Sequence, residues 1–165
     1  MAAFLTRMPS GIPGDLTRQS AATVEPQPLA SATPFATYGA FGYMTAAGAF
    51  APIITTTTVG QVYGLLVRPF PTTGINASDP LGTSVPPTTG IANVLRRGYI
   101  NVTLAGGTAY AGLQVYVRTV VGTSGHAIGA IEAAPSDTAN CLAISNCFFT
   151  GPADASGNVE IGYNI

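Results

Sequence analysis

The residues that could serve as a nucleophile and a base are few and lie in the C-terminal half of the chain. His126 is the only histidine, so a serine or cysteine nucleophile would have to use it as the general base. Cys141 or Cys147, together with His126 and Asp137, would supply the residue types of a catalytic triad. A triad is defined by its geometry, however, and no nucleophile elbow or oxyanion motif accompanies these residues. The sequence therefore predicts no enzymatic activity, and we interpret His126 as a turn residue after Gly125.

Motifs for metal ions and cofactors are equally weak. Zinc sites typically pair cysteines as C-x2–4-C, whereas five residues separate Cys141 from Cys147. Residues 154–158, DASGN, resemble the start of a calcium-binding loop, but the glycine comes too early and the closing glutamate is missing. A turn between two strands is the simpler interpretation. We expect no metal and no cofactor. Because the N-terminus lacks the order of a secretory signal, we also expect no export and free thiols.

Arg96 and Arg97 form the only adjacent pair of charged residues and stand just before the clearest strand pattern. In residues 99–104, apolar residues alternate with polar ones, as in a strand with one buried face. Neighbouring side chains on a strand point to opposite faces. At least one of the two guanidinium groups should therefore face solvent or a partner's carboxylate, and both are candidate contact residues.

Short strands and turns alternate along the rest of the chain. The expected strands are residues 59–68, 99–104, 113–121, 127–133, 141–149 and 159–163. Gly106 and Gly107 predict a hairpin between the second and third of these. Residues 72–90, rich in Gly, Pro, Ser and Thr, predict a long loop that serves binding or is plain surface. The pattern predicts an all-β fold, a small β-barrel or a jelly-roll-like β-sandwich, with an extended N-terminal arm.

The arm is expected over residues 1–34, where five prolines disfavour both helix and central strand. Such a segment is either disordered in isolation or extended along a partner surface. We divide the chain into an arm and connector, residues 1–50, and a β-domain, residues 51–165. Tethering would raise the effective concentration of the arm at its target to about millimolar. The candidate contact residues of the arm are the charged residues Arg7, Asp15, Arg18 and Glu25.

Aromatic residues alternate with glycines in residues 38–44, YGAFGYM. Tyr38 and Phe41 are candidate contact residues, because small neighbours permit close approach and the rings supply buried area. The alternative is that these rings pack on the chain's own barrel, and the sequence leaves both possibilities open.

The composition favours a protein that works in an assembly. Only 8% of the 165 residues are charged, and all six basic residues are arginine. A surface so poor in charge either depends on Thr, Ser and Asn for solvation or is buried against other subunits. The net charge of −1 provides no basic field for nucleic acid, and no apolar run is long enough for a membrane-spanning helix. We expect a homo-oligomer, a dimer or a trimer, that binds neither nucleic acid nor membrane.

Several segments resemble the structural cement, or capsid decoration, proteins of tailed bacteriophages. They are MPSGIPGD (8–15), YGAFGYM (38–44), VYGLLVRPFPT (62–72), VLRRGYINV (94–102) and GPADASGNVEIGYNI (151–165). The resemblance implies a non-enzymatic β-domain with an N-terminal arm that docks on the outside of an icosahedral shell. Its partner would be the major capsid protein, whose neighbouring subunits it would tie together. The protein would be assembled in the host cytoplasm and then reside on the outer surface of the virion.

The alternative from another class is a virion-surface adhesion or glycan-binding module. Exposed aromatic side chains of residues 38–43 that line a groove would favour it.

Overall fold

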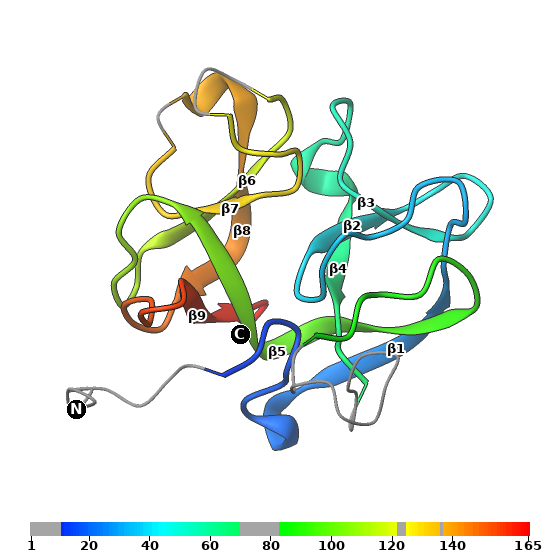
Figure 1. Ribbon diagram of the computed structural model, residues 1–165, viewed down its shortest axis with the longest axis horizontal. Coiled ribbons are helices and arrows are strands. Elements are labelled where there is room, and N and C mark those ends of the chain that lie inside the picture. The colour runs from blue at the N-terminus through cyan, green and yellow to red at the C-terminus, as the bar shows by residue number, and fades with distance from the viewer. Residues whose placement is uncertain (1–10, 70–82, 122–124, 136) are drawn as a thin grey trace.

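In the part of the chain that the structure describes, nine β-strands and three short 3-10 helices make up the regular structure (Figure 1). A computed structural model describes residues 11–69, 83–121, 125–135 and 137–165. The strands are β1 (Thr23–Pro28), β2 (Phe41–Met44), β3 (Phe50–Pro52), β4 (Val62–Leu66), β5 (Ile91–Gly106), β6 (Gln114–Arg118), β7 (Ile131–Glu132), β8 (Cys141–Phe149) and β9 (Asn158–Tyr163). The helices are η1 (Gln19–Ala21), η2 (Val59–Gln61) and η3 (Thr138–Asn140). The all-β fold class is confirmed.

The C-terminal strands close into a small barrel with the second half of β5. Going around the barrel, β5 pairs with β7, β7 with β6, β6 with β8, β8 with β9, and β9 again with β5. The β5–β7 pair is parallel and the others are antiparallel. The barrel occupies the left of Figure 1. Closure leaves this sheet without free edges.

The first half of β5 belongs to a second, open sheet, which is antiparallel throughout. The order of its strands is β3-β2-β4-β5-β1, so β1 and β3 are the outer strands. An isolated parallel bridge between Leu29, which follows β1, and Phe50 of β3 joins them at one end. The two halves of β5 meet at Gly98, whose φ of +138° is one that residues with a side chain rarely adopt. A Cβ atom at Gly98 would also lie 3.0 Å from the Cα atom of Ala22. Glycine therefore permits both the change of direction and the close packing of the N-terminal segment.

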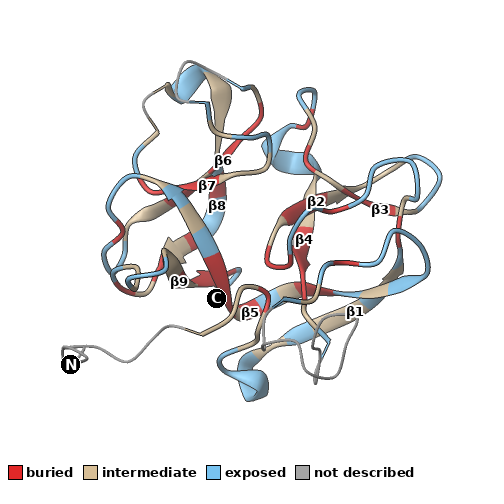
Figure 2. Ribbon diagram, in the orientation of Figure 1, coloured by how far each residue is buried: buried red, intermediate tan, exposed pale blue. Residues whose placement is uncertain are grey.

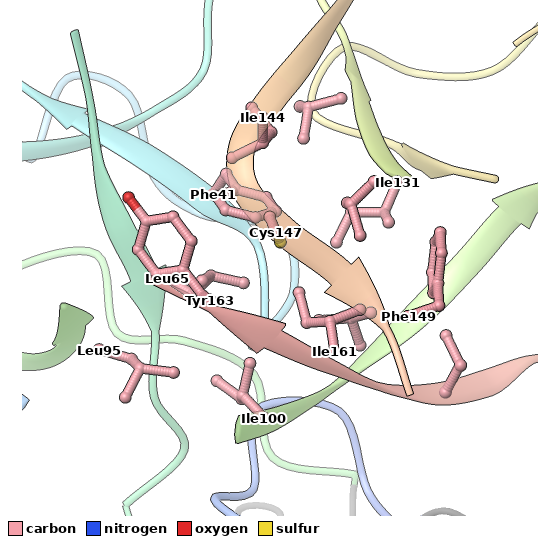
Figure 3. Close-up of a cluster of buried hydrophobic side chains, with 14 of the residues drawn as sticks. Phe41, Leu65, Leu95, Ile100, Ile131, Ile144, Cys147, Phe149, Ile161 and Tyr163 are labelled. Atoms are coloured by element: carbon pink, nitrogen blue, oxygen red, sulfur yellow. The ribbon is translucent and has the colours of Figure 1, made fainter. Parts of the chain in front are cut away.

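One hydrophobic core joins the barrel to the open sheet (Figures 2 and 3). The ring of Phe41 meets the ring of Tyr163 edge-on across the junction, with 5.7 Å between centroids. Leu65 and Leu95 contribute to the same core from the open sheet. The opposite face of the open sheet is covered by a smaller cluster, in which Phe35 stacks on Phe50 at 4.9 Å.

The expected strands agree with the structure except in their extent. Residues 141–149 coincide with β8, and residues 59–68 contain η2 followed by β4. Strand β5 begins at Ile91 and is much longer than residues 99–104 suggested. Of the expected loop 72–90, residues 72–82 lie outside the described residues, and residues 83–90 hold no strand or helix.

The expected hairpin between residues 99–104 and 113–121 is wrong. Strand β7 lies between β5 and β6, pairing Ile131 with Leu104 on one side and with Val117 on the other. The hairpin fails because a strand from later in the chain takes up the ladder positions that a direct β5–β6 pairing would have used.

The N-terminal residues that the structure describes are part of the folded body. Strands β1 and β2 lie before residue 50, and they pair with β5 and β4, which lie after it. The division of the chain at residue 50 stays a prediction.

Candidate interface residues

The eight residues that the sequence singled out fall into three groups. Arg7 lies outside the described residues. Tyr38 and Phe41 are 5% and 0% exposed, so of the two alternatives for these rings the structure favours packing inside the chain. The remaining five, from the arm and from β5, come together around the middle of β5: Asp15, Arg18, Glu25, Arg96 and Arg97.

The Arg96 cluster crosses the open sheet on one face, from β1 over β5 to β4. The Arg96 guanidinium lies 3.6 Å above the centre of the Tyr63 ring, and its Nε atom is 3.6 Å from Oε2 of Glu25. The Tyr63 hydroxyl donates a hydrogen bond of 2.6 Å to the same carboxylate and accepts one from Gln27. The hydrogen bond to Glu25 raises the pKa of Tyr63 above its usual value, because it favours the protonated phenol. The Arg96 guanidinium is therefore engaged by Glu25 and Tyr63 of its own chain.

The Arg18 cluster joins the residues before η1 to the barrel. Arg18 lies 3.8 Å above the centre of the Tyr99 ring on β5 and forms a 2.8 Å ion pair with Glu160 on β9. The Arg18 side chain is half exposed, so the ion pair contributes little to stability, and its role is to position the segment.

Arg68, which the sequence did not single out, organises a third cluster. It lies 4.6 Å from the centre of the Tyr38 ring, donates to the Pro13 carbonyl at 3.1 Å and faces Asp15 at 3.8 Å. Burial raises the pKa of Asp15, and the Arg68 charge partly offsets this. Nothing in the local pattern at Arg68 signalled the contact, because its partners are about 30 and 55 positions away in the sequence.

Among the described arginines of the predicted set, Arg97 takes part in none of these clusters. Each cluster joins residues 13–27 to the rest of the fold, so charges that we expected to serve a partner also hold the chain to itself. Arg97 is exposed and forms no ion pair with the described residues. Whether these residues contact another protein stays a prediction.

The candidate triad is not assembled in the described residues. His126 Nδ1 is 2.9 Å from Oε1 of Glu132, and Asp137 caps η3 through the amide of Ala139. Cys147 is 3% exposed and burial strongly raises the pKa of its thiol, which opposes formation of a reactive thiolate. Both cysteines are free, as expected.

Glu132 is instead the centre of a buried ion pair that joins β7 to β6. Arg118 binds it with two hydrogen bonds of 2.6 and 3.0 Å, and the side chains are 0% and 1% exposed. The Arg118 hydrogen bonds are the main reason that the pKa of Glu132 lies below its usual value, with His126 acting in the same direction. Burial and the Glu132 charge raise the pKa of the neighbouring Cys141 thiol. The polar atoms of this group form hydrogen bonds with one another, as in a buried network that stabilises a fold.

Two features are absent from the part of the chain that the structure describes. No group of three or more His, Cys, Asp or Glu side chains is placed to hold a metal ion. Across the same residues, no helix has the length and apolar character needed to cross a membrane.

Comparison with known proteins places the chain among capsid proteins. A chain in the solved structure "The capsid of Myoviridae Phage XM1" is 18% identical, with a TM-score of 0.68 over 98% of this chain and 95% of that chain. At this identity the likeness shows a shared fold. No curated protein matches the chain. A family model described as XM1 gp53 minor capsid protein matches residues 1–163. The chain therefore belongs to the XM1 gp53 minor capsid protein family.

Proposed function

We propose that this chain is a non-enzymatic structural protein that docks on the outer surface of the icosahedral capsid of a bacteriophage. There it ties neighbouring subunits of the major capsid protein together and stabilises the expanded shell. The observation that carries the proposal is the family match over residues 1–163. Membership of a capsid protein family supports a structural role in the virion. The capsid chain of the same fold supports it.

The surface of the described residues suits burial in an assembly. Charged residues form only 8% of the chain, and most of the described ones are engaged in contacts within it. Large apolar side chains are exposed near the start of β5, with Val85 at 72% and Ile91 at 73%. Single exposed apolar residues are ordinary, but together with a sparse charge they favour a surface that another protein covers.

Docking through side chains fits the open sheet better than strand addition. The amide of Leu29 donates to Gly90 at 2.8 Å, which makes these two a hydrogen-bonded pair of the β1–β5 ladder. In an antiparallel ladder, the backbone N–H and C=O groups of every second residue point away from the partner strand. Counting from Leu29, these outward positions of β1 are Pro28 and Pro26. Proline cannot donate to a further strand and is typical of protected edges. Pro52 similarly ends the edge strand β3.

Arg97 is the described contact residue that the geometry favours most. Because it is exposed and unpaired in the described residues, its guanidinium can form a bidentate pair with a carboxylate of a capsid subunit. Arg96 is held by Glu25 and Tyr63, so its role is to keep β1 against the sheet. Arg7 remains a further contact in this proposal.

The mechanism is linkage. A protein that binds the expanded lattice but not the separated subunits stabilises the lattice by mass action, and each molecule that bridges two subunits strengthens the effect. A homo-oligomer, a dimer or a trimer on a local symmetry axis, would multiply the bridges.

The test is co-sedimentation of the full chain with expanded and unexpanded shells that lack it. We expect selective binding to expanded shells, and for Arg97→Ala a loss of affinity of about tenfold or more, as for a charge-assisted pair worth about 1.5–3 kcal/mol. Ile165→Ala is the matched control, since Ile165 is 45% exposed and forms part of no cluster described above.

Equal binding of wild type and Arg97→Ala would remove Arg97 from the interface. Absence of binding to either shell would contradict the docking role itself. The glycan-binding alternative gains no support, because Tyr38 and Phe41 are buried.

A further inference from the structure

Closure removes edge strands from the barrel, but β8 runs past the end of its neighbour β9. Strand β9 pairs with only the last three residues of β8, 147–149. One more backbone hydrogen bond, from the amide of Asn164 to the carbonyl of Asn146, follows at 2.8 Å. On this side, residues 141–145 have no neighbouring strand among the described residues, although β6 pairs with 141–143 on the other side. We call residues 141–145 the β8 overhang.

The backbone groups of Ala143 point away from β6. The amide of Thr119 donates to the carbonyl of Asn140 at 2.9 Å, so these two residues form a hydrogen-bonded pair in line with the β6–β8 ladder. Hydrogen-bonded and non-hydrogen-bonded pairs alternate along an antiparallel ladder. Three positions farther along β8, Ala143 is therefore in a non-hydrogen-bonded pair, and its N–H and C=O groups face the open side.

The backbone groups of Ser145 face the same open side. The carbonyl of Ile144 accepts a 2.6 Å hydrogen bond from the Gln114 side chain of β6, so the groups of its neighbour Ser145 point the other way. No described residue forms a hydrogen bond with the backbone of Ala143 or Ser145 on this side, and both residues are exposed. The overhang, CLAIS, also lacks the prolines and charges that protect strand edges. It can therefore pair with a further strand.

A groove of about 280 Å³ lies beside the overhang. Ile144 and Ser145 line it from β8, Val59 lines it from η2, and Tyr163 lines it at the end of β9. Helix η2 packs against β8 next to the groove. This neighbour suits a single extended segment better than the broad edge of another sheet.

Arg96 is the one charged residue among the described residues that line the groove. Glu25 faces its Nε atom at 3.6 Å and Tyr63 covers one face of its guanidinium, but its two Nη atoms form no hydrogen bond with the described residues. Burial raises the pKa of Tyr163, whereas the Asn164 side chain and the Arg96 charge lower it, so this charge acts on the groove. Because no described carboxylate lines the groove, the Nη atoms are suited to a carboxylate from outside.

We propose that the groove binds an extended acidic segment of a capsid subunit, which pairs through its backbone with the β8 overhang and through an aspartate or glutamate side chain with Arg96. A second copy of this chain fits less well, because its described carboxylates are engaged within their own chain. They are Asp15, Glu25, Glu132, Asp137, Asp154 and Glu160. That the partner is a capsid subunit rests on the proposed function, whereas the chemistry of the segment does not.

The first test needs no capsid. The probes are two pentapeptides with blocked ends, TVDVT and TVNVT, added up to millimolar concentrations to the full chain labelled with nitrogen-15. We expect saturable shifts of the amide resonances of Ala143 and Ser145 with TVDVT. Binding of TVNVT should be several-fold weaker, because its amide side chain carries no charge to pair with Arg96.

A pair of variants at one position tests the backbone contact. Ala143→Pro removes the outward amide and leaves the ladder with β6 intact, so it should abolish peptide binding. Ala143→Val is the matched control, because it keeps the amide, and it should bind TVDVT as wild type does. Absence of saturable shifts in wild type, equal affinity for the two peptides, or equal binding by the two variants would each overturn the inference. If Ala143→Pro does not fold, the comparison of the two peptides on wild type decides.

The second test is co-sedimentation of the same variants with expanded shells. Ala143→Val should bind like wild type, and Ala143→Pro should lose affinity by about tenfold or more, as for lost hydrogen bonds of the strand pairing. Equal binding of both variants to the shells would overturn the inference and leave the proposed docking intact. A wild-type chain that binds TVDVT but no shell would instead contradict the proposed docking, and with it the assignment of the segment to a capsid subunit.

Discussion

Arg118 and Glu132 show how a chain with few charges uses a buried pair. Both side chains are excluded from solvent, and their two hydrogen bonds hold β6 against β7 within the barrel. Removing two charges from water is costly, and the attraction between them offsets that cost only when the geometry is good and the remaining polar atoms are paired. His126 and the carbonyl of Val120 supply such partners.

Glu132→Gln should lower the free energy of unfolding by about 3–5 kcal/mol, because it leaves the Arg118 charge buried without a counterion. Urea denaturation followed by circular dichroism measures the change. Glu160→Gln is the matched control, since its ion pair with the half-exposed Arg18 should be worth less than about 1 kcal/mol. Equal effects of the two substitutions would contradict the account of the buried pair.

The pH dependence of stability, compared between wild type and Glu132→Gln, tests the buried pair in a second way. Arg118 holds the pKa of Glu132 below its ordinary value of 4.5, so its stabilising contribution is complete above that value. The contribution is lost as the pH falls from 4.5 through the lower pKa of the folded state. Wild type should therefore lose stability over this acid range, and Glu132→Gln should lose less. A parallel decline in both proteins would count against Glu132 as the titrating group.

At the scale of the elements, the prolines of β1 disfavour the pairing of a further strand with the edge of the open sheet. Strand β1 is an edge strand, and its outward positions hold Pro26 and Pro28. An edge strand with free amides is a template for uncontrolled pairing, which prolines prevent.

Replacing Pro26 and Pro28 together by valine should increase self-association, because valine restores two outward amides and favours strand structure. Sedimentation velocity over a range of concentrations measures it. The control replaces two exposed residues that are not on an edge strand, Thr88 and Thr89, by valine, which adds comparable apolar area without edge amides. Self-association that is the same in both double variants would mean that the edge plays no part.

The elements also show what the sequence could predict and what it could not. Strand β8 coincides with its expected range because alternation and turn residues are local signals. The pairing of β7 between β5 and β6 was missed because Ile131 and Glu132 form a strand of only two residues, too short to display a period. The adjacent charges of Arg96 and Arg97 stand out in the sequence, but local pattern could not show that Glu25 and Tyr63 hold Arg96 while Arg97 stays exposed.

For the whole molecule, the barrel, the open sheet and the N-terminal segment form one body with one continuous core. Strand β5 belongs to both sheets, and the Arg18, Arg68 and Arg96 clusters fasten residues 13–27 to it. A body held together in this way, with most of its described charges engaged within it, suits the proposed docking between subunits of a shell.

The most direct test of docking between subunits is an electron cryomicroscopy reconstruction of expanded shells with and without the added chain. The account predicts additional density on the outer surface, fitted by this fold and in contact with at least two major capsid subunits, with Arg97 at a contact. Density on the inner surface, or density that touches a single subunit, would contradict it.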